Sequence, residues 1–214
     1  GNNLIAKARG TIWSNIYKML KPYFEQETGQ AFASGIKVLV RVSVDFHELY
    51  GYSLTVLDID PTYTVGDMER KRREILRQLE EEGVIDLNKE LEMPVLPQRI
   101  AVISSATAAG YGDFCNQLSN NPRGYGFYTE LFPAIMQGER VEESIIAALD
   151  AIYARLEAFD VVVIIRGGGA TSDLSGFDTY ELAANCAQFP LPIITGIGHE
   201  RDDTVIDKVA HTRV

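Results

Sequence analysis

The chain has 214 residues, of which 46% are hydrophobic and 23% are charged, and these proportions are ordinary for a globular protein. Its formal net charge of −10 at pH 7 argues against a broad basic surface for nucleic acid, although local basic patches stay compatible with it. No apolar run approaches the roughly 20 residues that a membrane span needs, and no signal-peptide pattern opens the sequence. Cys115 and Cys186 form no CxxC motif, so we expect core thiols in a cytoplasmic protein without a membrane association.

Residues 1–65 predict a small β-rich module. KARGTIWS suggests a short strand, and the apolar residues of NIYKMLKPYFEQ fall at helical spacing. In residues 37–60, valines alternate with other residues on both sides of the turn signal HELYG, which predicts a β-hairpin with a half-buried face. These strands are too few to close on themselves, so we expect further strands of the module to precede Gly1.

A helix is predicted from Asp67 to Glu82, because Met68, Ile75, Leu76 and Leu79 form an apolar stripe that Gly83 ends. We expect residues 66–93 to act as a linker helix. The helix carries the most basic stretch of the chain, which consists of Arg70, Lys71, Arg72 and Arg73. These side chains either form a solvated helix face or contact the phosphates of a nucleic acid.

Residues 94–214 predict an α/β domain. Apolar strand candidates at 99–105, 126–134, 160–165 and 191–198 alternate with helical patterns at 139–159, 178–188 and 203–210. This alternation is typical of a parallel sheet, here of about four strands, in a three-layer domain with helices on both faces. Ligands of such sheets bind beyond the carboxyl ends of the strands.

Three strand ends carry the turns SSATAAGYGD, RGGGATSD and TGIGHERD, which are rich in Gly, Ser or Thr and end in acids. In the second turn, Arg166 precedes three glycines, Gly167, Gly168 and Gly169. Backbone amides of consecutive glycines can form an anion-binding nest, and a guanidinium suits phosphate oxygens. We therefore predict phosphate binding there, while a tight turn with Arg166 in a structural ion pair remains the alternative.

His199, in the third turn, is a candidate general acid or base near neutral pH. Asp202 is placed to orient the imidazole or, with it, to bind a metal. Asp203 is predicted to cap the helix that follows. Asp113, at the end of the first turn, is a candidate site carboxylate or a helix-surface residue. No motif requires a cofactor, and the carboxylates suit Mg²⁺ only loosely, so a divalent metal is optional.

Two aromatic residues, Tyr50 and Tyr52, flank the predicted hairpin turn. Aromatic rings at exposed positions can stack on the bases of a single strand. Packing within the module is the alternative role for both.

Four stretches resemble the large subunit of exodeoxyribonuclease VII. They are VISSATAAGYGD at 102–113, QGE at 137–139, IIRGGGATSDLSGFDTYELA at 164–183 and ITGIGHERDDTVIDKVAHTR at 194–213. The N-terminal part is similar to the later portion of that family's OB-fold, a fold that binds single strands. The family often has Asn–Asp–Glu after the phenylalanine, whereas here Phe177 precedes Asp178, Thr179, Tyr180 and Glu181.

The resemblance implies hydrolysis of single-stranded DNA from its ends to 5′-phosphorylated products. It also implies a complex with many copies of a small subunit, bound through a helical region that follows Val214 in the family. The essential residues that it implies are Asp113, Arg166, His199 and Asp202. Two other readings of the residues remain: an α/β protein that binds a nucleotide or sugar phosphate, and a non-catalytic binder of single-stranded DNA.

Overall fold

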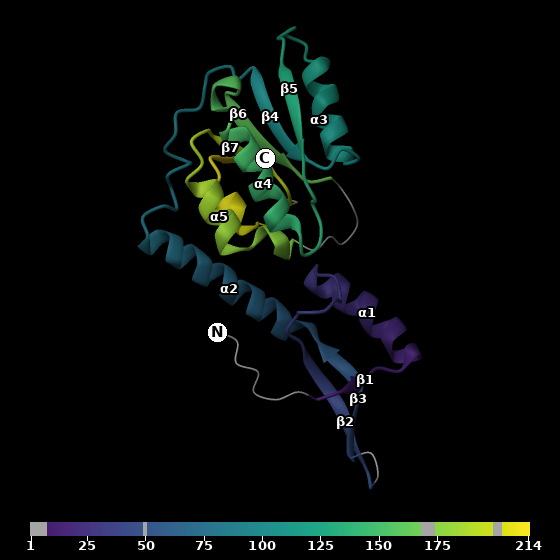
Figure 1. Cartoon of the computed structure of the whole chain (residues 1–214). Helices are drawn as coiled ribbons and strands as arrows, with labels where there is room; N and C mark the ends of the chain where they lie inside the picture. The colour runs from purple at the N-terminus through teal and green to yellow at the C-terminus, as the bar shows by residue number, and fades with distance from the viewer. Residues whose placement is uncertain (1–7, 49–50, 168–173, 199–202) are drawn as a thin grey trace. The chain divides into compact units, whose positions relative to one another are not determined.

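The computed structural model describes residues 8–48, 51–167, 174–198 and 203–214 (Figure 1). The chain divides into two compact units, Gly1–Arg70 and Lys71–Val214, which are described separately. The predicted division of the chain into residues 1–65, 66–93 and 94–214 stays a prediction. Among the described residues, no helix combines the length and the apolar character that crossing a membrane requires.

The N-terminal unit contains a sheet of order β1-β3-β2 and a helix beside it (Figure 1). Its elements are β1 (Gly10–Thr11), α1 (Ser14–Thr28), β2 (Leu39–His47) and β3 (Gly51–Asp60). The predicted hairpin and the predicted helix are both confirmed. The helix buries Leu20 and Phe24, and the ring of Phe24 meets that of Phe32 edge-on at 5.2 Å between centroids.

The two hairpin strands pair antiparallel with a register shift between Arg41 and Val42. Val40 and Val42 are half-buried opposite Ile59 and Val56, as the alternation predicted. Val44, nearer the turn, is exposed instead. The alternating pattern therefore identifies one face of the hairpin correctly. Only the part of that face far from the turn is covered by other residues.

The helix α2 (Pro61–Glu81) begins earlier than the predicted Asp67. The carboxylate of Asp60 accepts a hydrogen bond from the backbone N–H of Thr62 at 3.0 Å, which is the contact of an N-capping aspartate. Proline suits the first helical position, since that N–H has no partner within a helix. The sequence therefore contains a helix-start signal, Asp60 followed by Pro61. The predicted start at Asp67 is late because the apolar stripe begins only at Met68.

The C-terminal unit is built on one sheet of five parallel strands in the order β5-β4-β6-β7-β8. The strands are β4 (Arg99–Ser104), β5 (Tyr128–Pro133), β6 (Val161–Ile165), β7 (Ile193–Gly196) and β8 (Thr212–Arg213). The helices that follow α2 are α3 (Ala109–Ser119), α4 (Val141–Tyr153), α5 (Tyr180–Ala187) and α6 (Val205–Val209), with single 3₁₀ turns at Leu156–Ala158 and Ser175–Phe177. The parallel α/β fold is confirmed, with β8 added to the four predicted strands.

Both faces of the sheet are covered, as predicted (Figure 1). Along β6, Val162 and Ile164 point to one face, where they join a core formed with α4, α5, α6 and the end of α2. Val161, Val163 and Ile165 point to the other face, where α3 packs. A strand buried on both faces is continuously apolar, which explains the run VVVII.

Of the two thiols, Cys186 is fully buried, and burial raises its pKa to about 12.

The amino ends of β4 and β6 are joined by an ion pair. The carboxylate of Asp160 accepts hydrogen bonds from the side chain and backbone N–H of Arg99 and from the backbone N–H of Gln98. The Arg99 guanidinium, helped by these N–H groups, lowers the pKa of Asp160 against the opposing effect of burial. The pair thus fastens two central strands at the edge opposite the strand carboxyl ends.

The lowered pKa predicts how Asp160 contributes to stability at different pH. A carboxyl group whose pKa is lower in the folded state stabilises the fold above its unfolded pKa of about 3.9 and loses that contribution as the pH falls further. We expect Asp160→Asn to lower the free energy of unfolding by about 1 kcal/mol at neutral pH, because the pair is partly exposed. In urea unfolding, the gap between wild type and variant should close between about pH 5 and pH 2; a constant gap contradicts the assignment.

Candidate functional site

Three predicted turns follow neighbouring strands of the sheet. Strand β6 lies between β4 and β7, and all three run in the same direction. Their carboxyl ends are Ser104, Ile165 and Gly196, so the chain leaves all three at the same edge. The expected meeting of the three turns at one edge is confirmed for their described residues.

The ends of these strands are fastened to one another by hydrogen bonds. The hydroxyl of Ser104, which is fully buried, donates to the carbonyl oxygen of Ile165 at 2.7 Å. The backbone N–H of Arg166 donates to the carbonyl oxygen of Gly196 at 3.0 Å. The backbone at Arg166 is therefore held from both neighbouring strands, which fixes where its side chain starts.

Two glycines allow the first turn to pack directly on the second. A Cβ atom on Gly110 would lie 3.1 Å from the carbonyl oxygen of Arg166. A Cβ atom on Gly167 would lie 2.7 Å from the Cβ of Ala108, closer than real side chains approach. The first turn of α3 thus lies against the backbone of Arg166 and Gly167.

Asp113 is exposed in the second turn of α3, three residues after Gly110. Residues three apart on a helix share a face, so the contact of Gly110 brings the Asp113 side of α3 to the Arg166 turn. Arg166 and Gly167 are half-buried. The other candidate residues of this edge, Gly168, Gly169, His199 and Asp202, lie outside the described residues.

The close approach at Gly167 leads to a test by substitution. We expect Gly167→Ala to lower the free energy of unfolding by about 1–3 kcal/mol, because the new methyl group meets the Cβ and Cα atoms of Ala108, which cannot move aside as the end of a flexible side chain would. Thermal or urea unfolding measures this. The control is Gly126→Ala, where nothing lies within 4 Å of the added Cβ. Equal stabilities of the two variants would contradict the packing described here.

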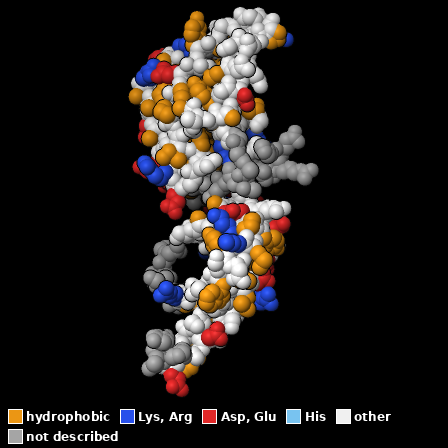
Figure 2. Space-filling model, turned by 90° about the vertical axis from the view of Figure 1, so that its right-hand side faces the viewer, with side chains coloured by type: hydrophobic (Ala, Val, Ile, Leu, Met, Phe, Trp, Pro, Cys, Tyr) orange, Lys and Arg blue, Asp and Glu red, His pale blue; other side chains and the backbone are white. Residues whose placement is uncertain are grey.

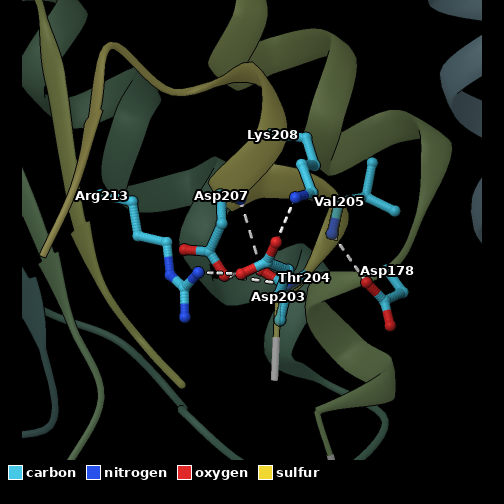
Figure 3. Close-up of polar contacts among 7 residues, drawn as sticks. All are labelled: Asp178, Asp203, Thr204, Val205, Asp207, Lys208 and Arg213. Atoms are coloured by element: carbon cyan, nitrogen blue, oxygen red, sulfur yellow. Dashed lines mark hydrogen bonds and ion pairs between the residues drawn. The ribbon is translucent and has the colours of Figure 1, made fainter. Parts of the chain in front are cut away.

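The prediction that Asp203 caps the last helix is wrong. Thr204 is the N-cap of α6: its hydroxyl accepts from the N–H of Asp207, and the Asp207 carboxylate accepts from the N–H of Thr204 at 2.8 Å (Figure 3). Asp203 instead forms ion pairs with Lys208 and Arg213. The Thr-x-x-Asp pattern was a capping signal that outweighs a lone aspartate.

Asp178 is a buried carboxylate that the sequence did not single out as a site residue. One oxygen accepts from the backbone N–H of Val205 at 2.8 Å, as Figure 3 shows, and the other accepts from Nε of Arg72 at 2.6 Å. Burial raises the pKa of this carboxyl group, while the Arg72 guanidinium and the Val205 N–H oppose the rise. The one feature of the sequence that distinguished Asp178 is that it follows Phe177 at the position where the family often has asparagine.

The basic stretch on α2 is not uniform. Arg70 pairs with the buried carboxylate of Asp67, and Lys71 and Arg73 have exposed side chains. The Arg72 side chain is only 20% exposed and holds Asp178. The proposed contact of all four residues with DNA stays a prediction, but the structure gives Arg72 a structural partner that the sequence did not indicate.

The hairpin of the N-terminal unit presents aromatic rings. Tyr52 is 76% exposed, and its ring packs against that of Phe46 at 5.1 Å between centroids. Phe46 lies directly opposite Tyr52 in the strand register and is itself 64% exposed. Tyr50 lies outside the described residues. Figure 2 shows further hydrophobic side chains on the surface of the N-terminal unit. The sequence prediction did not include Phe46, because its pairing with Tyr52 across the hairpin depends on the strand register.

No group of three or more His, Cys, Asp or Glu side chains that could hold a metal ion occurs among the residues that the structure describes. The prediction of an optional Mg²⁺ concerns Asp113 together with residues outside that range, so it stays a prediction.

A parallel sheet whose neighbouring strands end in polar turns defines an α/β protein, and in such proteins the carboxyl edge of the sheet is where a candidate ligand site is sought. Residues 84–214 match the family described as exonuclease VII, large subunit. The chain belongs to this family, as the resemblance of its motifs predicted.

The chain is 37% identical over 212 residues to the exodeoxyribonuclease 7 large subunit of Deinococcus radiodurans, a match that covers 98% of this chain and 51% of the relative. It is 37% identical over 149 residues to the protein of that name from a Cyanothece species, covering 70% of this chain and 34% of the relative. For the Lactobacillus johnsonii protein the identity is 32% over 196 residues, covering 91% and 42%. The chain therefore spans about half or less of the length of these relatives.

Proposed function

We propose that this chain carries the catalytic part of an exodeoxyribonuclease, which hydrolyses single-stranded DNA from its ends to 5′-phosphorylated oligonucleotides. Membership of the exonuclease VII large-subunit family supports the proposal. The observation that carries it is the packing of the Asp113 helix on the backbone of Arg166 at the shared strand edge. This packing brings the helix that carries Asp113 and the turn that carries Arg166 together at one edge of the sheet.

Arg166 and the amides of Gly167–Gly169 bind the scissile phosphate. The guanidinium offers a planar pair of donors to phosphate oxygens, and consecutive glycine amides add donors at close range. Charge on those oxygens grows in the transition state, so fixed donors lower the barrier. The hydrogen bonds that hold the Arg166 backbone support such a preorganised role.

Hydrolysis requires one water molecule and one proton donor. Water attacks phosphorus, a new P–O bond forms, and the bond from phosphorus to the 3′ oxygen breaks, which leaves phosphate on the 5′ end of the product. His199 takes the proton of the attacking water or supplies one to the departing 3′ oxygen. Asp202 orients the imidazole, and Asp113 positions the water.

Magnesium enters the proposal only as an option. Among the described residues of this edge, the Asp113 carboxylate is of the type that Mg²⁺ prefers. A bound Mg²⁺ would polarise a phosphate oxygen or its own water. The proposed hydrolysis uses the chain's own residues alone. Cleavage that persists in EDTA supports that assignment, whereas cleavage that EDTA abolishes and Mg²⁺ restores gives Asp113 a metal-binding role.

Two further surfaces bind other parts of the DNA strand in this proposal. Exposed Phe46 and Tyr52 form a ring pair on which bases can stack, with Tyr50 beside them in sequence. The exposed side chains of Lys71 and Arg73, together with Arg70, contact backbone phosphates. We assign no phosphate contact to Arg72 in this proposal, because its guanidinium holds Asp178. In the whole protein, several copies of a small subunit complete the complex.

The test compares end-labelled single-stranded and double-stranded DNA with the full-length protein assembled with its small subunit. We expect rapid shortening of the single strand, little cleavage of the duplex, and products with 5′ phosphates. A thermal-shift comparison with mononucleotides and sugar phosphates is the companion measurement. Stabilisation by those small ligands together with an absence of DNA cleavage would overturn the proposal.

A further inference from the structure

Asp178 joins two loops of the C-terminal unit that are far apart in sequence. It stands at the end of the segment that follows β6, while Val205, whose N–H it binds, begins α6 after the segment that follows β7. Both segments carry predicted catalytic residues. Its side chain is only 9% exposed, so the contact with Val205 is shielded from water.

The charge of Asp178 is balanced from α2. Arg72 donates to the second carboxylate oxygen at 2.6 Å and is itself 20% exposed. A buried carboxylate with two donors on different elements has little freedom to rotate. Two further contacts hold the start of α6. They are the reciprocal hydrogen bonds of Thr204 and Asp207 and the ion pair of Asp203 with Arg213.

We propose that Asp178 is a positioning residue for the hydrolysis reaction: through Val205 it fixes the chain that leads into α6 relative to the Arg166 turn. Asp202 lies three residues before Val205 in the sequence. A shift of Val205, whose N–H is held by Asp178, would therefore displace the segment that carries the proposed pair His199 and Asp202. Displacements of about 1 Å remote from the chemistry can cost about 10²-fold in rate. The inference rests on the proposed function, because it assigns a role within that reaction.

The test separates the hydrogen bond to Val205 from the ion pair to Arg72. In the full-length complex, Asp178→Ala removes both, and we expect kcat on single-stranded DNA to fall between about 10-fold and 100-fold. The KM should stay within about twofold, since no DNA contact is lost. In an Arg72→Met background, Asp178→Asn keeps an oxygen for the Val205 N–H and should restore kcat to within about threefold of wild type, whereas Asp178→Ala should not.

The control for general destabilisation is Leu79→Ala, which removes a fully buried side chain of α2 from the same core. We expect its kcat to match wild type at a temperature where all variants are folded. The proposal is overturned if Asp178→Ala retains wild-type kcat, if Asn and Ala are equivalent in the Arg72→Met background, or if Leu79→Ala shows the same loss.

A second readout does not depend on DNA cleavage. Amide hydrogen exchange of residues 203–209 should become faster in Asp178→Ala, and not in the Asn variant of the Arg72→Met background. Unchanged exchange in Asp178→Ala would overturn the positioning role. If the wild-type complex cleaves no DNA, the proposed function fails, and the exchange measurement still decides whether Asp178 anchors α6.

Discussion

Replacement of Arg166 with alanine should lower kcat for single-stranded DNA by about 10²–10³-fold in the full-length complex, the range found when one donor to transition-state charge is removed. DNA affinity should change far less, because under the proposed function the aromatic and basic surfaces bind other parts of the strand. The reason is positional: the Arg166 backbone is held by Gly196 and lies against α3. Steady-state cleavage and equilibrium DNA binding, measured on the same preparation, separate the two effects.

The conservative substitution and a surface control sharpen this test. Arg166→Lys keeps the charge but loses the planar pair of donors, so we expect it to recover only part of the lost rate. Arg123→Ala removes an exposed arginine from the loop after α3 and should leave cleavage unchanged. Wild-type kcat in Arg166→Ala, or equal losses in both alanine variants, would remove Arg166 from the mechanism.

Asn88→Asp should cause a large loss of stability. The Asn88 side chain is fully buried and makes four hydrogen bonds. Its amide group donates to the carbonyl oxygens of Phe189 and Leu191, and its oxygen accepts from the N–H groups of Ile193 and His211. A carboxylate cannot donate, so two buried carbonyl groups would face a buried charge. We expect a loss of about 4 kcal/mol in the free energy of unfolding.

Urea unfolding followed by circular dichroism measures this loss. Asn120→Asp is the matched control, since Asn120 is exposed at the end of α3, and its replacement should cost no more than about 1 kcal/mol. Because the bonds of Asn88 fasten the chain at the starts of β7 and β8, protection from amide exchange should fall first there. Equal stabilities of the two variants would mean that the four hydrogen bonds of Asn88 do not stabilise the fold.

The fold was largely predictable because its elements have strong periodicities. The continuously apolar VVVII and the stripe of α4 indicated a strand buried on both faces and a helix packed on it. Strand β8, at Thr212–Arg213, was not predicted, because two residues are too few to show any period. The predicted start of α2 is six residues too late, because the Asp60-Pro61 signal precedes the apolar stripe.

The edge of the sheet at which the candidate turns meet was predictable, whereas the contacts that support these turns were not. Glycine-rich turns after neighbouring parallel strands meet at one edge for reasons of topology, which the alternation of strands and helices already implied. Pairings between residues far apart in the chain leave no local pattern. The ion pair of Arg72 with Asp178 spans such a distance, so the basic stretch of α2 suggested only a surface role. Likewise, the ion pair of Asp203 with Arg213, which lies beyond α6, leaves no local pattern from which it could be predicted.

The most direct test of the account concerns Asp113, whose place in the site depends on the packing of α3 against the Arg166 turn. The measurement is the single-turnover rate of single-stranded DNA cleavage by full-length Asp113→Asn, assembled with the small subunit, beside the exposed α3 control Gln117→Ala. We predict a rate at least about 10²-fold below wild type for Asp113→Asn, with DNA binding retained, and a wild-type rate for the control. A wild-type rate in Asp113→Asn would contradict the account, because α3 would then contribute no group to the site.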